Sequence, residues 1–291
     1  MTFVAEVERV WPGRRASFEV LGGGITNHNL KVEVDGEQFV LRVAGKDTGL
    51  LGIDRTVELA ATQAAAALGI GPEVVEFVEP EGWLVTRFVE GEIPALERMR
   101  EPAMLNRVAN ALRSFHDGVA IPGSFDSFRV VESYRQTAID RGGSAPDAYD
   151  WAHGVAARIE ATRGMNAPAP CHNDLLNANF LDDGEHLRIV DWEYAGMGDR
   201  FFDLANFSVN HELDDAESEV LLHAYFGEVR ASDVRGLALM RFMSDFREAM
   251  WGVVQSAVSE LDFDFDSYAA EHFARLERTA AAAAFVAALE G

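Results

Sequence analysis

The chain has 291 residues and a mass of 31.9 kDa, enough for one large domain or two modest ones with a substantial core. It carries 25 lysines and arginines against 48 aspartates and glutamates, a formal net charge of −23. A surface this negative repels nucleic-acid backbones and anionic lipids and attracts small cations, so we expect no nucleic-acid partner. A hydrophobic fraction of 48% indicates a packed globular protein.

The sequence contains a single cysteine, Cys171, which excludes a disulfide framework and a cysteine-built zinc site within one chain. Its first residues lack the basic segment and apolar core of a secretion signal. The longest apolar run, 280–289, is about half as long as the roughly 20 residues that a membrane-spanning helix needs. We therefore expect a cytoplasmic protein without membrane insertion.

Alternating apolar and polar residues in the first third of the chain predict β-strands. Asp35-Gly36 is typical of a two-residue hairpin turn, and Asp54 is suited to cap a helix that runs to Leu68. The result is a five-stranded antiparallel sheet with one helix inserted after the third strand. The predicted strands are 18–21, 29–34, 38–43, 74–78 and 83–88.

Helical periodicity dominates after Gly91, interrupted by a hairpin of strands 179–181 and 187–190. The predicted fold class is therefore α+β, with a β-rich lobe at 1–90, a larger, mainly helical lobe at 91–291, and a hinge at about 87–94. Asp203 is expected to begin a helix. The other predicted helices are 103–117, 131–140, 147–162, 216–226, 232–260 and 267–289.

Polar residues are concentrated in the segment 171–179, and an acidic residue follows the second strand of the hairpin. Asp174, Asn179 and Asp191 offer two carboxylates and an amide oxygen, which are the hard ligands that Mg²⁺ prefers. Zinc is disfavoured, because His172 has no second histidine or cysteine at motif spacing. Solvated loop acids are the alternative explanation in so acidic a chain, but the spacing H-x-D-x4-N with an aspartate twelve residues later is much rarer than an isolated pair.

This spacing resembles the catalytic and metal-binding loops of aminoglycoside phosphotransferases, choline kinases and their relatives, which belong to the protein-kinase-like fold. The segments 189–196, 202–206 and 250–255 resemble the choline/ethanolamine kinase group in particular. Earlier in the chain, 23–27 resembles the phosphate loop of that group. Residues 39–42 and 54–58 resemble its basic strand residue and its helix glutamate.

The resemblance implies a two-lobe kinase fold and an ATP-dependent enzyme that phosphorylates the hydroxyl group of choline, ethanolamine or a similar amino alcohol. It implies that 1–90 bind the nucleotide and that 91–291 carry catalysis and substrate binding. Asp174 would accept the proton of the substrate hydroxyl. His172 and Asp203 would orient the catalytic loop.

The resemblance also implies that Asn179 and Asp191 hold Mg²⁺, with Glu193 as a further ligand or a substrate anchor. Together with Asp174 and Asp203, these carboxylates are expected to repel one another until cations arrive.

Arg42 would pair with the phosphates of ATP and with Glu58, although an ordinary surface arginine is the alternative reading of that position. Adenine would bond the backbone of the hinge. The nucleotide-binding residues implied in this way are Gly23, Gly24, Thr26, Asn27, Arg42, Glu58, Arg87, Phe88 and Val89.

Choline kinases hold the trimethylammonium group between aromatic rings, each contributing about 0.5–2 kcal/mol. Trp251, Tyr194, Trp192 and Gln255 are the candidate substrate-binding residues here. Val254 stands where the group usually has a second tryptophan, which weakens the case for a quaternary amine and leaves the choice among choline, ethanolamine and other amino alcohols open.

Relatives of the same fold phosphorylate aminoglycosides, thiamine or a sugar such as methylthioribose, and these remain alternatives. A non-catalytic nucleotide-binding regulatory module is the alternative from another class, and the intact set of Asp174, Asn179 and Asp191 argues against it. The sequence leaves open the oligomeric state, the number of Mg²⁺ ions and the choice between ATP and GTP.

Overall fold

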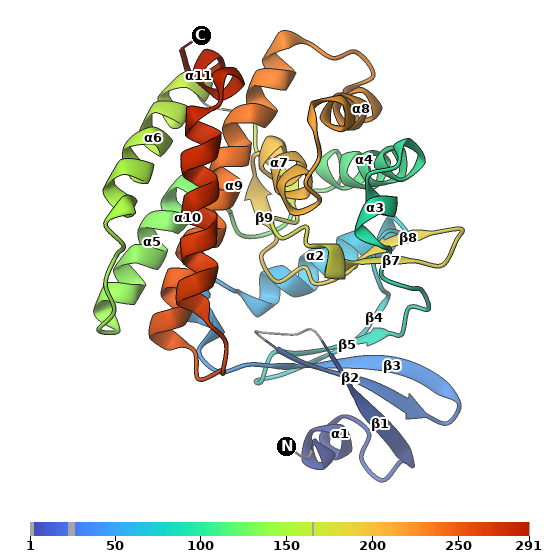
Figure 1. Cartoon of the computed structure of the whole chain (residues 1–291). Helices are drawn as coiled ribbons and strands as arrows, with labels where there is room; N and C mark the ends of the chain where they lie inside the picture. Colours follow the sequence, from blue (N-terminus) through green and yellow to red (C-terminus); the bar gives the residue numbers. More distant parts are fainter. Residues whose placement is uncertain (1–2, 23–26, 165, 291) are drawn as a thin grey trace. The chain divides into compact units, whose positions relative to one another are not determined.

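The computed structural model describes residues 3–22, 27–164 and 166–290 (Figure 1). The chain folds into two compact units. Unit 1 comprises Met1–Pro94 and Ala178–Tyr194, and unit 2 comprises Ala95–Asn177 and Ala195–Gly291.

Unit 1 is built on an antiparallel sheet whose strands lie in the order β1-β2-β3-β5-β4, with a single α-helix between β3 and β4. This is the predicted sheet with its one inserted helix. Its elements are α1 (Val4–Val10), β1 (Ala16–Leu21), β2 (Asn27–Val34), β3 (Glu37–Ala44), the 3₁₀ turn η1 (Thr48–Leu51), α2 (Arg55–Ala67), β4 (Val74–Val78) and β5 (Trp83–Arg87).

Local chemistry explains the two best-defined features of this sheet. Asp35 and Gly36 have φ values of 53° and 84°, the left-handed conformation that a two-residue hairpin turn requires, and they join β2 to β3 with Val34 opposite Glu37. Asp54 caps α2 by accepting hydrogen bonds from the N–H groups of Thr56 and Val57.

The core of unit 1 lies between α1 and one face of the sheet. Alternate residues of β2 and β3 point to this face, which is the arrangement that period-two patterning predicts. Trp11 at the end of α1 packs against Phe39, with ring centroids 5.5 Å apart. The other buried members of this core are Phe3, Val7, Val10, Leu30, Val32, Val34, Leu41, Val43, Val78 and Val85.

The segment Ala178–Tyr194 contributes the hairpin of β7 (Phe180–Asp182) and β8 (Leu187–Ile189) to unit 1. The N–H of Ile189 donates to the carbonyl oxygen of Ile70 at 2.6 Å, and Glu92 and Asp182 exchange two backbone hydrogen bonds of 3.0 Å. These bonds attach the hairpin to the end of α2 and to the chain after β5.

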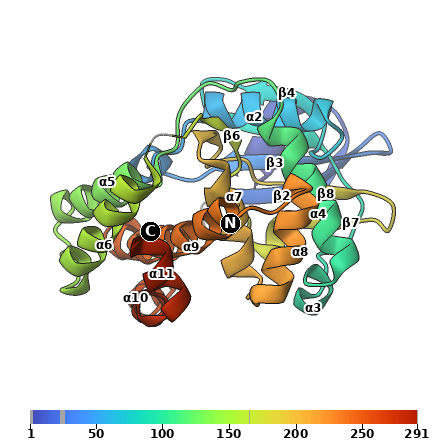
Figure 2. The same ribbon diagram turned by 90° about the horizontal axis from the view of Figure 1, so that it is seen from above.

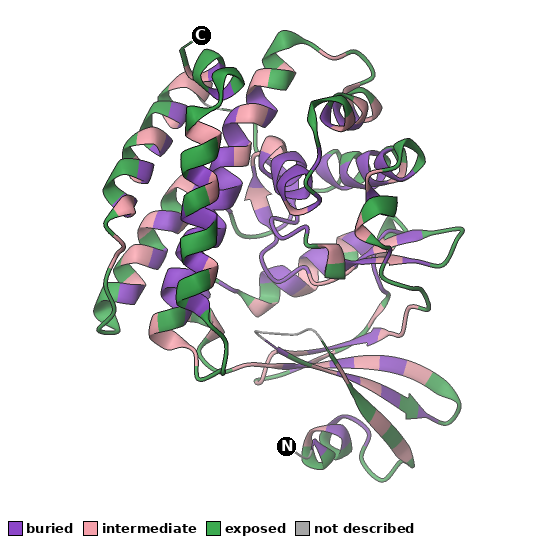
Figure 3. Ribbon diagram, in the orientation of Figure 1, coloured by how far each residue is buried: buried purple, intermediate pink, exposed green. Residues whose placement is uncertain are grey.

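Unit 2 is mainly helical, as predicted, and its longest helix is α9 (Ala231–Val258). Helix α9 packs against α5, α7 and α10, and Figure 3 shows that most of its surface is buried. Figure 2 shows α4 and α8 side by side. The remaining elements are α3 (Leu96–Met99), α4 (Pro102–His116), α5 (Ser127–Asp140), α6 (Ala148–Arg163), β6 (Ala169–Cys171), β9 (Gly196–Gly198), α7 (Arg200–Asn210), α8 (Asp215–Phe226), α10 (Phe265–Ala281) and α11 (Ala283–Glu290), with the 3₁₀ turn η2 (Asn177–Asn179) at the boundary between the units.

Some helix bounds in this unit differ from the prediction. Helix α5 begins at Ser127 and not at residue 131, because Asp126 caps it by accepting hydrogen bonds from the N–H groups of Phe128 and Arg129. The single helix expected over 267–289 is two helices, because Ala282 has the extended backbone angles φ −69° and ψ 132°. Helix α7 begins at Arg200 and not at Asp203, because Asp199 is its cap and accepts a hydrogen bond from the N–H of Phe201. None of the helices among the described residues is long and apolar enough to cross a membrane.

The contact between α9 and α10 generates a stability prediction. A methyl group on Gly252 of α9 would lie 3.0 Å from Cδ1 of Tyr268 and 3.1 Å from the backbone nitrogen of Ala269. We expect Gly252→Ala to lower the free energy of unfolding by about 1–3 kcal/mol, because overpacking outweighs the better helix propensity of alanine.

The control is Gly154→Ala in α6, where no heavy atom lies within 4 Å of the added methyl group. This change should raise the free energy of unfolding by up to about 1 kcal/mol. Urea unfolding of both variants measures the difference, and stabilisation by Gly252→Ala would show that the two helices are not packed this closely.

Candidate active site

Unit 1 contains a cavity of about 530 Å³, a size typical of small-molecule sites. Its walls are largely apolar, with Val40 and Leu84 from the sheet and Leu181 and Val190 from the 178–194 segment. Such walls suit a flat aromatic ring.

The predicted hinge residues Arg87, Phe88 and Val89 line this cavity. The N–H of Arg87 donates to the carbonyl oxygen of Glu73 at 2.8 Å, and the N–H of Phe88 donates to that of Gln38 at 3.0 Å. The ammonium of Lys31 lies 4.1 Å from the centroid of the Phe88 ring. The sheet therefore fixes the backbone of this segment at the edge of the cavity.

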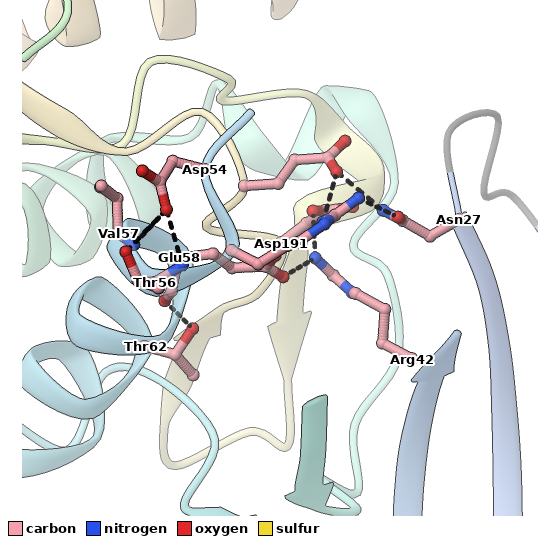
Figure 4. Close-up of polar contacts among 10 residues, drawn as sticks. Asn27, Arg42, Asp54, Thr56, Val57, Glu58, Thr62 and Asp191 are labelled. Carbon is pink, nitrogen blue, oxygen red and sulfur yellow. Dashed lines mark hydrogen bonds and ion pairs between the residues drawn. The ribbon is translucent and has the colours of Figure 1, made fainter. Parts of the chain in front are cut away.

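Three charged residues that line the cavity, Arg42, Glu58 and Asp191, belong to a charged cluster (Figure 4). Nη1 of Arg42 on β3 donates to Oε1 of Glu58 at 2.5 Å and to Oδ1 of Asp191 at 2.8 Å. Glu58 lies on the first turn of α2 and is 2% exposed. Arg42 thus connects the sheet, the helix and the 178–194 segment.

Arg55 is a member of this cluster that the sequence analysis missed. It donates to Oε2 of Glu58 at 2.6 Å, to Oε2 of Glu193 at 3.2 Å and to Oδ1 of Asn27 at 2.7 Å. Asn27 also donates to Oε2 of Glu193 at 2.8 Å. Helix spacing could have predicted this contact, because residues three positions apart lie on the same face of a helix and Arg55 is three residues before Glu58.

Burial and charge shift the pKa values in this cluster. Burial by itself lowers the pKa of Arg42, but attraction to Asp191, Glu58 and Glu193 outweighs it, and the pKa is raised. The pKa of Glu193 is raised to about 8, first by burial and then by repulsion from Asp191. Three carboxylates thus share two guanidinium groups, and the excess negative charge disfavours ionisation of Glu193.

The oxygen donors of Asn179, Asp191 and Glu193 fit a divalent cation. Asp191 and Glu193 supply carboxylate oxygens, and the N–H of Val190 donates to the carbonyl oxygen of Asn179 at 2.9 Å, which brings Asn179 beside the chain that leads to Asp191. Oxygen donors and uncompensated negative charge are what Mg²⁺ requires. Gly23, Gly24 and Thr26, predicted to contact the nucleotide, lie outside the described residues.

In unit 2, helix α7 holds the loop that carries Asp174. The carboxylate of Asp203 accepts the N–H groups of His172 at 2.8 Å and Asn173 at 2.7 Å, and Oδ1 of Asn206 accepts the N–H of Leu175 at 2.5 Å. Nδ1 of His172 accepts the N–H of Asp174 at 3.2 Å. The backbone around Asp174 is therefore fixed on both sides.

Asp203 is fully buried and paired with His116, whose Nε2 lies 3.0 Å from Oδ2 of Asp203 and whose Nδ1 lies 2.7 Å from the hydroxyl of Tyr225. Burial raises the pKa of Asp203, but the hydrogen bond and charge of His116 and the contacts with His172 outweigh it, so the pKa is lowered. Burial also raises the pKa of the Cys171 thiol well above its usual value, which keeps this cysteine unreactive.

The candidate acceptor-binding residues fall into two groups. Trp251 and Gln255 are buried on α9, and Trp251 meets Phe265 and Tyr268 edge-on at 5.8 and 5.6 Å between ring centroids. Trp192 and Tyr194 are buried in unit 1, where Nε1 of Trp192 donates to the carbonyl oxygen of Ile189 at 3.0 Å and Trp192 lines the cavity.

The expected repulsion appears between Asp191 and Glu193, because the Asp191 charge contributes to the raised pKa of Glu193. Each of the four acids also contacts a basic side chain, which the sequence analysis did not foresee for all of them. Asp191 pairs with Arg42 and Glu193 with Arg55, both in unit 1. In unit 2, Asp203 pairs with His116, and Asp174 pairs at 2.9 Å with Arg247, a second residue that the sequence analysis did not single out.

Comparison with known proteins identifies the family. The family model for choline/ethanolamine kinases matches residues 18–220, which is more than half of the chain. The chain belongs to the choline/ethanolamine kinase family. The match confirms the predicted resemblance, and the family consists of phosphotransferases that use a divalent metal with ATP and act on alcohol groups.

Protein LicA of Haemophilus influenzae is 28% identical over 210 residues, which cover 70% of this chain and 61% of LicA, so the match spans less than two thirds of that relative. A probable ethanolamine kinase of Arabidopsis thaliana is 26% identical over 289 residues, covering 87% of this chain and 76% of its own. The crystal structure of a choline/ethanolamine kinase family protein from Mesorhizobium loti superposes with a TM-score of 0.84 at 29% identity, covering 99% and 98% of the two chains. The predicted two-lobe kinase-like fold is confirmed.

The buried Asp203 predicts a large effect on stability. Asp203→Ala should lower the free energy of unfolding by about 3–5 kcal/mol, because two buried backbone N–H groups and His116 lose their acceptor. Urea unfolding at neutral pH measures the loss.

Asp183→Ala is the matched control, because the carboxylate of Asp183 also accepts two backbone N–H groups, those of Glu185 and His186, but on the surface. Water replaces these bonds in the variant, so its loss should be much smaller. Equal losses in the two variants would contradict a supporting role for Asp203 in the loop.

Proposed function

We propose that this protein transfers the γ-phosphoryl group of ATP to the hydroxyl group of choline, ethanolamine or a similar amino alcohol. The observation that carries the proposal is the family match over 18–220, because this range spans the cavity, the charged cluster and the Asp174 loop. Nucleotide binding is assigned to unit 1 and the acceptor alcohol to unit 2. An ATP-dependent reaction of this kind belongs in the cytoplasm.

Adenine is assigned to the apolar cavity of unit 1. Because Arg87 and Phe88 donate their N–H groups to the sheet, adenine would use their carbonyl oxygens and the N–H of Val89. Val40 and Leu84 would cover the ring from the sheet. Backbone contacts of this kind need no particular side chain at the hinge.

The phosphates are assigned to the charged cluster. Arg42 carries two adjacent N–H donors on a planar guanidinium, which suits phosphate oxygens, and Arg55 keeps Glu58 and Glu193 in place. Asn179, Asp191 and Glu193 would hold Mg²⁺, which when bound neutralises the charge of the phosphate oxygens. The backbone around Gly23 and Gly24, with Thr26 and Asn27, would supply further donors.

We assign to Asp174 the binding and deprotonation of the acceptor hydroxyl. Its carboxylate orients the hydroxyl and takes its proton as the oxygen forms a bond to the γ-phosphorus, while the bond from that phosphorus to the β,γ-bridging oxygen breaks and ADP leaves. His172 and Asp203 fix the backbone that carries this carboxylate.

The ammonium end of the acceptor is assigned to Trp251 and its neighbours. Trp251 would supply the ring for a cation–π contact with the ammonium group, and Gln255, one turn further along α9, lies on the same side of the helix. Tyr194 and Trp192 are the candidates from unit 1. The net charge of −23 favours the approach of any cationic amino alcohol.

The proposal predicts the acceptor class in a direct assay. Purified protein with Mg²⁺ and ATP is offered amino alcohols, aminoglycosides, thiamine and methylthioribose, and the release of ADP is measured. We expect turnover with choline, ethanolamine or a similar amino alcohol, and Asp174→Asn should lower kcat by about 10²–10⁴-fold with little change in ATP affinity. Turnover with another class alone, or with no acceptor, would overturn the proposal.

The metal assignment predicts a loss of nucleotide binding. Asp191→Ala should weaken Mg²⁺-dependent ATP binding by at least about tenfold, because a metal ligand is removed. Titration calorimetry measures the affinity, and Asp183→Ala, an exposed change in the hairpin of the same segment, serves as the control. Unchanged affinity in the Asp191 variant would contradict the metal assignment.

A further inference from the structure

Helix α9 supplies a buried cation to Asp174. Nη2 of Arg247 donates to Oδ1 of Asp174 at 2.9 Å and also to the carbonyl oxygen of Asn173. The guanidinium contacts the carboxylate and the backbone before it at once, and the Arg247 side chain is 1% exposed. This contact joins two positions that lie 73 residues apart in the sequence.

The other end of the guanidinium is held as well. Nη1 of Arg247 lies 3.0 Å from Oε1 of Glu248, and Oε2 of Glu248 accepts a hydrogen bond of 2.9 Å from the hydroxyl of Tyr268 on α10. Burial, and then the nearby Glu248 carboxylate, raise the pKa of Tyr268, so this hydroxyl stays a donor. The guanidinium is thus held between the carboxylates of Asp174 and Glu248.

The other titratable groups around Asp174 are His172, Asp203, Glu248 and Tyr268, and Glu248 shares Arg247 with Asp174. His172 accepts the N–H of Asp174, and Asp203 accepts the N–H groups of His172 and Asn173. On the side of α9 and α10 the groups are Glu248 and Tyr268. Among the ion pairs of the described residues, the Asp174 carboxylate takes part in the pair with Arg247.

A buried ion pair of this kind is a poor source of stability, because the desolvation of two charges offsets most of their attraction. An apolar pair of similar volume would serve folding at least as well. A reason for the pair is found instead in what the cation does to the carboxylate. A positive charge in contact with a carboxylate favours its ionised form and lowers its pKa by about one to three pH units.

We propose that Arg247 is a positioning residue for phosphoryl transfer, which holds the Asp174 carboxylate in one orientation through Oδ1 and keeps it ionised. The inference rests on the proposed function, in which Asp174 accepts the proton of the acceptor hydroxyl. Arg247 takes no proton and contacts no phosphate in this role. It acts through Asp174 alone.

The test separates the charge of Arg247 from its hydrogen bonds. Arg247→Gln keeps a donor and removes the charge, whereas Arg247→Lys keeps the charge. The pH profile of kcat/KM for the amino alcohol is measured with saturating Mg²⁺ and ATP. In Arg247→Gln, we expect the acidic limb to move up by about one to three pH units, whereas Arg247→Lys should leave it within a few tenths of a unit of the wild type.

The matched control is Arg241→Gln, six residues earlier on α9, where the arginine donates a hydrogen bond to the carbonyl oxygen of Leu213. Its acidic limb should not move. An unmoved limb in Arg247→Gln would overturn the inference. If Arg247→Gln is too unstable to assay, the result for Arg247→Lys is used instead. This variant keeps the cation, so a shift of its acidic limb by a full pH unit would also overturn the inference.

A second measurement needs no substrate. Urea unfolding of Arg247→Gln, Asp174→Asn and the double variant at neutral pH gives the coupling between the two side chains. We expect the double variant to lose less stability than the sum of the two single variants, and a strict sum would overturn the inference. A wild-type protein that phosphorylates no amino alcohol would refute the proposed function, while the coupling would still report on the ion pair.

Discussion

Carboxylates buried in a protein must meet a cation or several hydrogen-bond donors, because the cost of removing a charge from water is otherwise too high. In unit 1, Arg42 meets this requirement for Glu58 and Asp191 together. One guanidinium thereby ties the third strand to the first turn of α2 and to the acidic end of the 178–194 segment. Glu58 in turn contacts Arg55, which extends the charged cluster to Glu193 and Asn27.

The same requirement gives an acid of unit 2 and an acid of unit 1 different roles. Asp203 has its oxygens filled by two backbone N–H groups and by His116, and its lowered pKa reflects a carboxylate that is fully committed to the fold. Glu193 shares Arg55 with Glu58, and burial together with the Asp191 charge raises its pKa to about 8. A carboxylate with too few cationic partners can bind a metal ion, whereas a carboxylate whose oxygens already accept hydrogen bonds holds the backbone in place.

Much of the fold could be predicted because its signals are local. The Asp35-Gly36 turn, the Asp54 cap and the alternation of β2 and β3 depend on residues within a few positions of one another, and all appear as expected. The break at Ala282 carries no glycine or proline, so nothing local distinguishes an alanine-rich helix from two. The three-residue strands β6 and β9 are too short for periodicity to reveal them.

The sequence by itself determined the family, the sheet with its inserted helix, and which residue types stand in the acidic motif, because spacing and periodicity are properties of the chain. Only the tertiary structure decided which cation each acid meets. Arg55 joins Glu193 across 138 positions, and Arg247 joins Asp174 across 73. A chain with 23 arginines offers many partners for each carboxylate, and only packing brings one particular guanidinium into contact with it.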